Sequence, residues 1–550
     1  IIDSKENQLH INEISKQEID EIIQYFSNNN IDNNYLHNLE KIKHIYLSGF
    51  PISYNNLFPN NNATTISLPL YPFEKSKFWI EQEKIISRDS ELSPKLHRPL
   101  YYEMVWQHTQ KNIQQEIKGN ILLLANDEFQ VTEFQKSLNQ TYNDITICCV
   151  VKNNRFHKMD TNMFSFNPSE KNGYRELIHG LKKDNFIPNY IIHALNIKKI
   201  INEFDTNKAY NEGLLSIFYL MQEIIHSELI NANSRIKMIF AYTYFANTAL
   251  PYLESVAGFT KSIPYLFPYF QCSTVQLLKD SSGIPNIVKE LANITVGIGS
   301  EVRYSADNRY IKSFKPLQNI FSSSSGIKNK GVYIITGGMG GLGIIFAEYL
   351  TQKYKANLII TGRKEKNQAI LSKISQLEQY GSQIIYVQGD VSKRNDVDTI
   401  IHTALKEFGS INGIFHLAAS TTQKYITDKT DKEFKNTLDA KMTGTVLLDE
   451  KTSDVALDFF IVFSSISSIF GDFGECDYAA GNRFLDSYME YRIQLVGEKK
   501  RSGKSISINW PLWQDGGLHV DKELEKEHLD KLGLNYLDTK TGLTIFENIH

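Results

Sequence analysis

Cysteine is scarce in this sequence, and its few positions form no pattern. A disulfide framework or a zinc site needs ligands at short, regular spacings, which the four cysteines do not offer: Cys148, Cys149, Cys272 and Cys476. We therefore expect no bound metal and a protein of the reducing cytoplasm. Cys476 also lacks the histidine context of a thiol nucleophile, which argues against cysteine catalysis.

Long apolar runs and strong net charge are also missing. No stretch reaches the roughly 18 apolar residues of a membrane span, and the first residues lack the basic and apolar parts of a signal peptide. A net charge of −3 over 550 residues gives no reason to expect nucleic acid or a membrane as partner. Because there is no initiator methionine, we expect a segment of a longer polypeptide.

The length predicts several domains, because a compact domain takes about 100–200 residues. We predict an N-terminal linker or adaptor segment at 1–95, a first α/β unit at 96–327 and a second at 328–550. Within the first segment, asparagine-rich stretches surround one expected helix, Gln17–Phe26. Prolines and aromatic residues at Ser67–Trp79 are typical of an ordered, extended linker.

The first α/β unit alternates short apolar runs with helical patterns, which predicts a doubly wound parallel sheet. The expected strands are Gly119–Ala125, Ile145–Val151, Tyr190–Leu195, Ile236–Tyr242 and Ser273–Leu278, with a hairpin at 301–314. The first strand continues into Asn126-Asp127-Glu128-Phe129, without a glycine. Backbone that carries Cβ atoms cannot approach a pyrophosphate closely, so we expect this unit to bind no dinucleotide.

The second unit begins with a glycine-rich turn between a strand and a helix. The buried strand Val332–Ile335 precedes the turn at 336–343, and residues 344–350 have helical spacing. Glycines permit a tight turn and close backbone approach, and the helix N-terminus then faces a pyrophosphate. The position between strand and helix favours a dinucleotide site over a plain turn. The residues expected to contact the cofactor here are Thr336, Gly337, Gly338, Gly341, Leu342 and Gly343.

The tip of the next strand carries two cations, Arg363 and Lys364. This tip lies beside the adenosine ribose, where an acidic residue would accept from a 2′-hydroxyl. Two cations suit a 2′-phosphate instead, so we predict NADPH as the cofactor. A third strand leads to Asp390 and Val391, where we expect the Asp390 carboxylate to accept from the adenine amino group.

Four further residues indicate a reducing centre. Phe459–Phe463 is predicted as a buried strand that delivers Ser465 at its carboxyl end, where ligands bind in open α/β sheets. Tyr478 follows 13 residues later at the start of a helical pattern, with Asn482 one turn beyond it. Lys441 lies 24 residues before Ser465. Each residue alone has an ordinary structural interpretation, but the combination favours catalysis.

This pattern resembles the short-chain dehydrogenase/reductase superfamily, and specifically the ketoreductase domains of modular polyketide synthases. In the wider superfamily the lysine lies four residues after the tyrosine. Here Asn482 has that place and Lys441 lies 37 residues before Tyr478, an exchange characteristic of the synthase ketoreductases. The resemblance implies two tandem Rossmann-like sheets: a structural subdomain without cofactor at 96–327 and an NADPH-binding catalytic subdomain at 328–550.

The same resemblance implies an activity, which is reduction of a β-keto group to a β-hydroxyl on a chain carried by the phosphopantetheine of an acyl carrier protein. Tyr478 is expected to donate a proton to the ketone oxygen and Ser465 to donate a second hydrogen bond. Lys441 is expected to lower the tyrosine pKa from its ordinary value of about 10, and Asn482 to order a water or fix Lys441. Further cofactor contacts are expected at Ala418, Ala419 and Pro511.

The resemblance also implies neighbouring synthase domains, of the class served by free-standing acyltransferases.

Some positions depart from the family pattern. Thr421-Thr422-Gln423 replaces the Leu-Asp-Asp motif of one stereochemical group, Phe470 replaces the tryptophan of the other, and Glu475 replaces a usual glutamine. The missing aspartate favours the L-hydroxy (A-type) alcohol. Three alternatives remain open: a silent scaffold for dimerisation or docking, an epimerase or α-ketoacyl reductase, and a free-standing reductase of small ketones.

Overall fold

The computed structural model describes residues 21, 22, 24 and 34–47, and then 101–549 except for 110–115, 198–204, 228, 230–234, 246–249, 279–282, 295–298, 306–307, 318–325, 423 and 518–534. Residues 1–95 and 96–550 form two separate compact units. In the first unit α2 (Tyr35–Leu47) is described, and the three described residues of the expected helix Gln17–Phe26 are helical. The predicted linker Ser67–Trp79 lies outside the described residues. Over the described part of the chain, no helix is long and apolar enough to cross a membrane.

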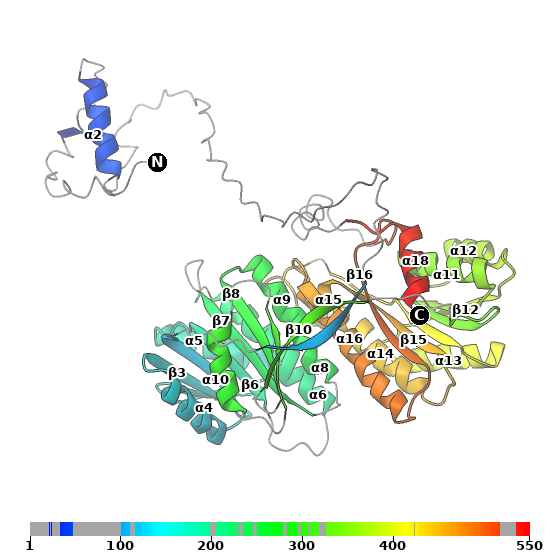
Figure 1. The fold of residues 1–550 in the computed structure, drawn as a ribbon, viewed down its shortest axis with the longest axis horizontal. Coiled ribbons are helices and arrows are strands. Elements are labelled where there is room, and N and C mark those ends of the chain that lie inside the picture. The colour runs from blue at the N-terminus through cyan, green and yellow to red at the C-terminus, as the bar shows by residue number, and fades with distance from the viewer. Residues whose placement is uncertain are drawn as a thin grey trace, which may run out of the picture. The chain divides into compact units, whose positions relative to one another are not determined.

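The second unit contains two sheets (Figure 1). Within the described residues the first has ten strands, in the order β1 (Tyr102–His108), β10 (Asn308–Pro316), β9 (Glu301–Ser305), β8 (Phe270–Leu278), β7 (Ile236–Tyr244), β6 (Tyr190–Asn196), β2 (Gly119–Ala125), β3 (Ile145–Lys152), β5 (Met163–Phe166) and β4 (His157–Asp160). The strands from β9 to β5 run parallel, whereas β1, β10 and β4 pair antiparallel at the two edges. The predicted parallel strands and hairpin are confirmed, and the antiparallel edges β1 and β4 were not predicted.

The second sheet has six parallel strands in the described residues. Their order is β13 (Ile384–Gln388), β12 (Asn357–Gly362), β11 (Val332–Thr336), β14 (Gly413–His416), β15 (Phe459–Ser465) and β16 (Lys504–Trp510). The chain moves outward from β11 in one direction and then restarts on its other side with β14. This reversal is the place where open α/β sheets bind ligands, so it locates the site between the ends of β11 and β14.

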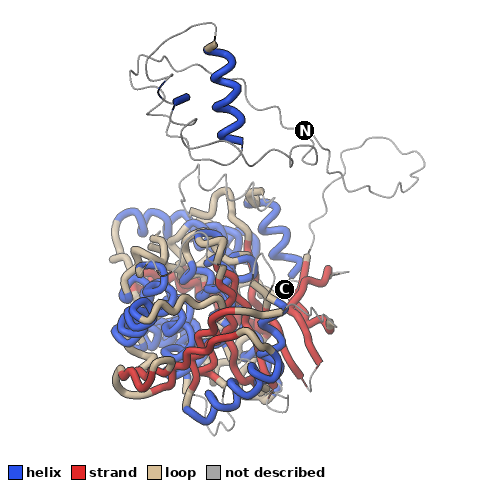
Figure 2. Tube along the Cα trace, turned by 90° about the vertical axis from the view of Figure 1, so that its left-hand side faces the viewer, coloured by secondary structure: helices blue, strands red, loops and turns tan. Residues whose placement is uncertain are grey.

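Helices cover both faces of each sheet (Figures 1 and 2). The outer face of the first sheet carries α4 (Glu128–Thr141) and α10 (Ile284–Asn293), and that of the second carries α11 (Gly341–Tyr354), α12 (Gln368–Glu378) and α18 (Thr539–Ile549). Between the sheets lie α5 (Lys171–Lys183), α6 (Thr206–Ala209), a π-helical turn (Tyr210–Leu215), α7 (Ser216–His226), α8 (Pro251–Glu254), α9 (Val256–Leu266), α13 (Arg394–Phe408), α14 (Asp431–Lys451), α15 (Ser467–Phe470) and α16 (Cys476–Gly497). Successive β2 residues therefore alternate between two apolar cores, as a sheet covered on both faces requires.

The helices between the sheets form one continuous core. Phe218 of α7 stacks on Phe434 of α14 with ring centroids 4.0 Å apart. Gly258 of α9 lies so close to α16 that a Cβ there would be 2.3 Å from the Ala479 carbonyl oxygen. This core spans both predicted subdomains, and a subdomain boundary at 327/328 remains a prediction. The shared core gives α16 a rigid support on the first sheet's helices.

The first strand-to-helix turn of the first sheet is filled by side chains. Asn126 Nδ2 donates to the carbonyl oxygens of Ala194 and Ile197 at 3.4 and 3.1 Å, and Asp127 caps α4 by accepting from the Gln130 N–H. Polar side chains thus tie the turn to the end of β6 and to the start of α4. The second sheet has glycine in the corresponding turn.

Candidate functional site

A cavity of about 750 Å³ follows the carboxyl ends of the second sheet's strands. Its walls come from the glycine turn after β11, the tip of β12, the end of β15, the start of α16 and residues 510–517. Of the predicted site residues it is lined by Gly337, Gly341, Leu342, Gly343, Arg363, Lys364, Ala419, Lys441, Ser465, Tyr478 and Pro511. The predicted residues outside this lining are Thr336, Gly338, Asp390, Val391, Ala418 and Asn482.

The glycine turn has the geometry of an anion site. Gly337 has φ +65°, in the left-handed region that favours glycine. Helix α11 starts at Gly341 without a side-chain cap, and the N–H groups of a first helical turn have no intrahelical partner, so they can hold a phosphate. Gly341 has a second role that was not predicted, because a Cβ there would lie 2.3 Å from the Gly516 carbonyl oxygen. Glycine at 341 lets residues 516–517 pack on the turn.

Thr336 lies beneath the turn and supports it. It is fully buried, and its hydroxyl lies 2.7 Å from His416 Nδ1. It also accepts from the backbone N–H groups of Leu417 and Ala418 at 3.2 Å each. Thr336 and Ala418 therefore fix the β11 and β14 ends against each other behind the cavity wall, and a direct cofactor contact from either remains a prediction.

The two cations at the tip of β12 face the cavity. Arg363 and Lys364 are exposed and line it, and neither belongs to an ion pair with any acidic residue in the described part of the chain. The Tyr386 hydroxyl fixes the backbone beneath them by donating to the carbonyl oxygens of Gly362 and Lys364 at 3.1 and 2.5 Å. The charges of both side chains are thus available to an anionic ligand.

Asp390 and Val391 lie behind the cavity. The Asp390 carboxylate accepts from the Ser392 N–H at 3.0 Å and from its hydroxyl at 2.7 Å, so it caps its own turn. Val391 is buried and packs against Gly444 of α14, where a Cβ would lie 2.8 Å away. A contact of Asp390 with an adenine amino group remains a prediction.

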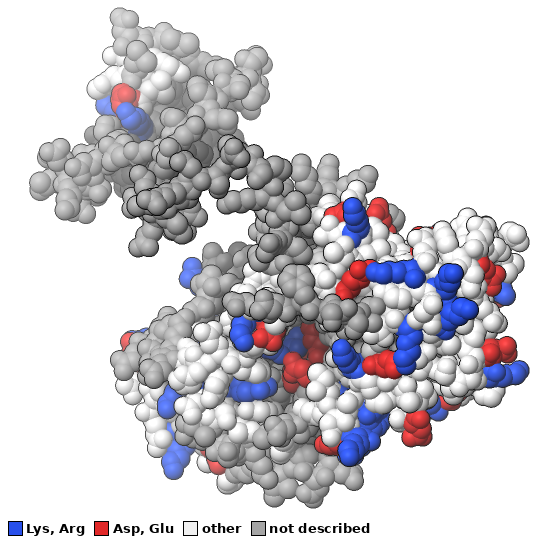
Figure 3. All heavy atoms as spheres, turned by 45° about the vertical axis from the view of Figure 1, so that its right-hand side comes forward, with Lys and Arg blue, Asp and Glu red and all other residues white. Residues whose placement is uncertain are grey.

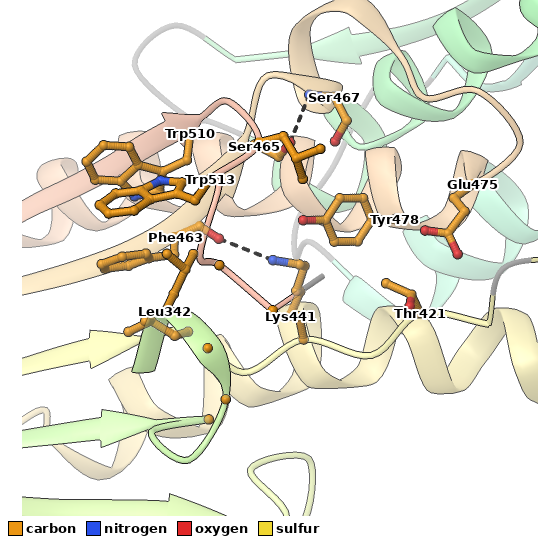
Figure 4. A pocket seen from close by; sticks show the side chains of 18 of the residues that line it. Leu342, Thr421, Lys441, Phe463, Ser465, Ser467, Glu475, Tyr478, Trp510 and Trp513 are labelled. Carbon is orange, nitrogen blue, oxygen red and sulfur yellow. Dashed lines mark hydrogen bonds between the residues drawn. The ribbon is translucent and has the colours of Figure 1, made fainter. Parts of the chain in front are cut away.

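Three predicted catalytic side chains converge in the cavity. Figure 4 shows Lys441 of α14, Ser465 of β15 and Tyr478 of α16 pointing toward one space. Lys441 Nζ lies 5.3 Å from the centroid of the Tyr478 ring and donates to the Phe463 carbonyl oxygen at 3.2 Å. The Ser465 hydroxyl accepts from the Ser467 N–H at 3.1 Å, which leaves its own proton free to donate. The structure brings together residues that are up to 37 positions apart.

Burial dominates the electrostatics of this group. It lowers the pKa of Lys441 to about 7, which the attraction of Asp486 only partly offsets. It raises the pKa of Tyr478 to about 12, against the opposing effect of the Asn482 and Ser465 side chains. The tyrosine pKa is therefore raised overall and not lowered as predicted, while a lowering contribution from Lys441 remains a prediction. The reason is physical: removing the phenolate from water costs more than its polar neighbours return.

Asn482 supports the site from behind. It is fully buried, and its Nδ2 donates to the Ser467 hydroxyl at 3.1 Å. Its backbone carbonyl accepts from the Ser464 hydroxyl, also at 3.1 Å, which ties α16 to the end of β15. Its Oδ1 is buried without a hydrogen-bond partner. The predicted role of Asn482 in ordering water or fixing Lys441 remains a prediction.

A further wall of the cavity is the loop at residues 470–475, of which the sequence pointed only to Phe470 and Glu475. Gly471 and Gly474 both have positive φ, at 84° and 101°, and these two glycines around an acid were the available signal. Burial, with repulsion from Glu475, raises the pKa of Asp472 to about 7. The first sheet's α9 holds the loop: the Ser262 hydroxyl accepts from the Asp472 N–H at 2.9 Å.

Neither metal ligands nor a reactive thiol accompany the site in the described residues. No cluster of His, Cys, Asp or Glu that could hold a metal occurs among them. All four cysteines are free and buried, and burial raises the pKa of Cys476 far above its usual value, which leaves it a poor nucleophile. Figure 3 shows basic and acidic side chains interspersed on the face that it presents.

Comparison with known proteins finds matches to both parts of the second unit. Residues 331–515 match the family model "KR domain", and residues 119–293 match "Beta-ketoacyl synthase-like, N-terminal". Polyketide synthase PksM of Bacillus subtilis (strain 168) is 27% identical over 519 residues, which is 92% of this chain and 12% of that protein. Polyketide synthase PksN of the same strain is 36% identical over 279 residues, 50% of this chain and 5% of that protein. The chain thus spans a small part of these relatives' length.

Solved structures of similar fold include two ketoreductases that come from assembly lines. An N-terminal ketoreductase from the macrolactin assembly line is 29% identical, with a TM-score of 0.70, and the match covers 81% of this chain and 88% of that one. A ketoreductase domain from the bacillaene assembly line is 24% identical, with a TM-score of 0.59 and coverage of 82% and 93%. The second likeness shows the fold alone.

Proposed function

We propose that this chain is a ketoreductase of a polyketide synthase, and that it uses NADPH to reduce the β-keto group of a polyketide intermediate bound to an acyl carrier protein. The observation that carries the proposal is the convergence of Lys441, Ser465 and Tyr478 in a cavity floored by a glycine turn. A phenol, a hydroxyl and a buried amine at one end, and free cations at the other, are what reduction of a ketone by a phosphorylated dinucleotide requires.

The residues present fit NADPH. The first turn of α11 offers unpaired N–H groups to a pyrophosphate, and Arg363 and Lys364 offer charge to a 2′-phosphate. The cavity continues from there to Tyr478, and Pro511 and Leu342 line it on the way. The bound cofactor supplies the hydride, and the protein holds it and the ketone in reach of one proton donor.

Tyr478 serves as that proton donor. With a pKa of about 12 the phenol is fully protonated at neutral pH, so it can give a proton to the oxygen that gains charge when the carbonyl carbon is reduced. The Ser465 hydroxyl donates a second hydrogen bond to the same oxygen. Lys441 lies beside the ring and stabilises the phenolate left after proton transfer. The resulting alcohol has gained one hydride and one proton.

Stereochemistry and partners complete the proposal. Thr421 and Phe470 both line the cavity. Thr421 begins the stretch that replaces the Leu-Asp-Asp motif of one stereochemical group, and Phe470 stands in place of the tryptophan of the other. The missing aspartate favours the L-hydroxy (A-type) product. The substrate is presented on phosphopantetheine, and the neighbouring domains are those of a cytoplasmic synthase served by free-standing acyltransferases. A membrane, a nucleic acid and a metal are not among the partners that we propose.

A direct assay tests the activity. Purified chain is incubated with NADPH and a β-ketoacyl N-acetylcysteamine thioester, NADPH oxidation is followed by absorbance, and the alcohol is analysed on a chiral column. We expect turnover by the wild type and a loss of at least about 10²-fold in kcat for Tyr478→Phe. Tyr491→Phe is the matched control, since Tyr491 lies on the same helix outside the cavity.

The outcomes separate this function from its alternatives. A silent scaffold would bind NADPH weakly or not at all and would oxidise none, which an NADPH fluorescence titration detects. An epimerase would exchange the α-proton of the thioester with deuterated water without consuming NADPH. Equal turnover by Tyr478→Phe and Tyr491→Phe would remove Tyr478 from the mechanism.

A further inference from the structure

A buried ion pair lies directly behind the proposed catalytic tyrosine. Lys429 Nζ lies 2.6 Å from both carboxylate oxygens of Asp477, and both side chains are fully buried. Asp477 precedes Tyr478 in the chain, and its Oδ1 also accepts from the Tyr478 backbone N–H at 3.0 Å. Neither Lys429 nor Asp477 lines the cavity, so the pair touches neither substrate nor cofactor.

The pair joins the two helices that carry the catalytic groups. Lys429 lies two residues before α14, which bears Lys441, and Asp477 lies in the first turn of α16, which bears Tyr478. A capping box between Thr430 and Glu433 starts α14 immediately after Lys429. The pair therefore fixes where both helices begin relative to each other, and with them the 5.3 Å between Lys441 Nζ and the Tyr478 ring.

The first sheet's helices hold the lysine end of this link. Gln222 of α7 donates from Nε2 to the carbonyl oxygens of Ile426 and Lys429, at 2.7 and 2.8 Å. Gln222 is itself buried. A chain of contacts thus runs from Gln222 through Lys429 and Asp477 to the Tyr478 backbone.

A contribution to folding stability does not explain why such a pair is buried here. Removing two charges from water is costly, and apolar side chains of similar volume in place of a buried pair are often neutral or stabilising. A buried pair with good geometry does, however, fix one arrangement of the elements that carry it. We propose that Lys429 and Asp477 are positioning residues, which hold Tyr478 at the distance from Lys441 that proton transfer to the substrate requires. This inference rests on the proposed reductase function.

The test removes the pair without leaving a lone buried charge. The double variant Lys429→Met/Asp477→Leu is assayed with NADPH and the β-ketoacyl N-acetylcysteamine thioester, and folding is followed by circular dichroism and thermal melting. NADPH fluorescence titration gives the number of competent sites per chain. We expect one site per chain, a melting temperature at or above that of the wild type, and KM within about twofold. We expect kcat to fall at least tenfold.

A second buried carboxylate on the same helices supplies the matched control. Asp449 of α14 binds Arg492 of α16 at 2.7 Å, with both side chains fully buried, and also binds Arg501 at 2.9 Å. Arg492 lies roughly 21 Å along α16 from Tyr478 at 1.5 Å per residue. Asp477→Asn and Asp449→Asn are both isosteric and both remove one buried charge. If both variants bind one NADPH per chain, kcat should fall at least tenfold in Asp477→Asn and less than twofold in Asp449→Asn.

Each outcome decides the inference. Wild-type kcat in a folded double variant would overturn it, and so would loss of folding in that variant, because the pair would then be structural. Equal losses in Asp477→Asn and Asp449→Asn would show a general stability effect and overturn it as well. If the wild type itself oxidises no NADPH, the proposed function fails first, which separates the two results.

Discussion

Removing the Lys441 charge should stabilise the folded chain while it abolishes reduction. Burial lowers the pKa of Lys441 from its ordinary value of 10.5 to about 7, so the ammonium is less stable in the fold than in the unfolded chain. At about 1.4 kcal/mol for each pKa unit this amounts to about 5 kcal/mol. Lys441→Met removes the charge but also the hydrogen bond to the Phe463 carbonyl, worth about 1–3 kcal/mol. Lys441→Met should therefore raise the free energy of unfolding by about 2–4 kcal/mol.

The stability gained by Lys441→Met should fall as the pH rises. Below pH 7 Lys441 is protonated in both the folded and the unfolded chain, so the wild type bears the whole cost of about 5 kcal/mol for burying the charge. Between pH 7 and 10.5 the unfolded chain binds the additional proton, so the wild-type free energy of unfolding rises with pH. The advantage of Lys441→Met must therefore be largest at pH 6 and small near pH 10.

Thermal melting across pH 6 to 10 measures this effect. Lys441→Met should melt several degrees above the wild type at pH 6, and the difference should shrink steadily as the pH rises. Lys435→Met is the control, because Lys435 is an exposed lysine on the same helix and should change little at any pH. A variant less stable than wild type at pH 6, or an advantage independent of pH, would refute the reasoning.

Two further predictions concern the cofactor and the loop at 470–475. Arg363→Ser with Lys364→Ser should raise the dissociation constant for NADPH at least tenfold and leave that for NADH within about threefold, as measured by fluorescence titration, because only a 2′-phosphate needs the cations; equal changes would contradict a 2′-phosphate site. Tyr265→Phe removes the hydroxyl that donates to the Phe470 carbonyl at 3.2 Å, so the loop should loosen and the minor alcohol enantiomer should increase on a chiral column, with NADPH affinity unchanged. Unaltered product chirality would show that the loop does not orient the ketone.

The interior of the fold was predictable because its strands are short, continuous apolar runs. Strand β2 was predicted with its observed bounds, and β3, β6 and β7 to within two residues. The edge strand β1 was missed because most of its residues are half-buried or exposed, so no apolar run marks it. The same reasoning explains β4, whose four residues are all exposed.

The candidate site was predictable to the extent that side-chain chemistry and spacing decide it. Ser465 and Tyr478 converge because strand ends and helix starts of a parallel sheet meet at one edge. Lys441 joins them from the middle of α14. The tyrosine pKa was predicted in the wrong direction because burial, which no spacing reveals, outweighs the polar neighbours. The Lys429–Asp477 pair was missed because its partners are 48 residues apart and follow no helical or strand period.

The unit of the first sheet, whose corresponding turn has no glycine, helps to hold α16, the helix that bears the proposed proton donor. Three buried charges of α16 find their partners on other elements, at its start, middle and end. Asp477 binds Lys429, whose carbonyl is held by α7. Arg483 binds Glu254 and Glu301 at 3.1 and 2.8 Å, both from the first sheet's unit, and the two acids hold the Arg483 pKa far above its ordinary value.

Arg492 completes the series by binding Asp449 of α14. A buried charge is costly unless its partner is fixed, so each pair tolerates little displacement of α16 along or around its axis. Two of the three links lead to helices or strands of the first sheet's unit. The first sheet therefore contributes to reduction by fixing the helix from which Tyr478 projects, and substitutions at Glu254 or Glu301 should reach the active site through Arg483.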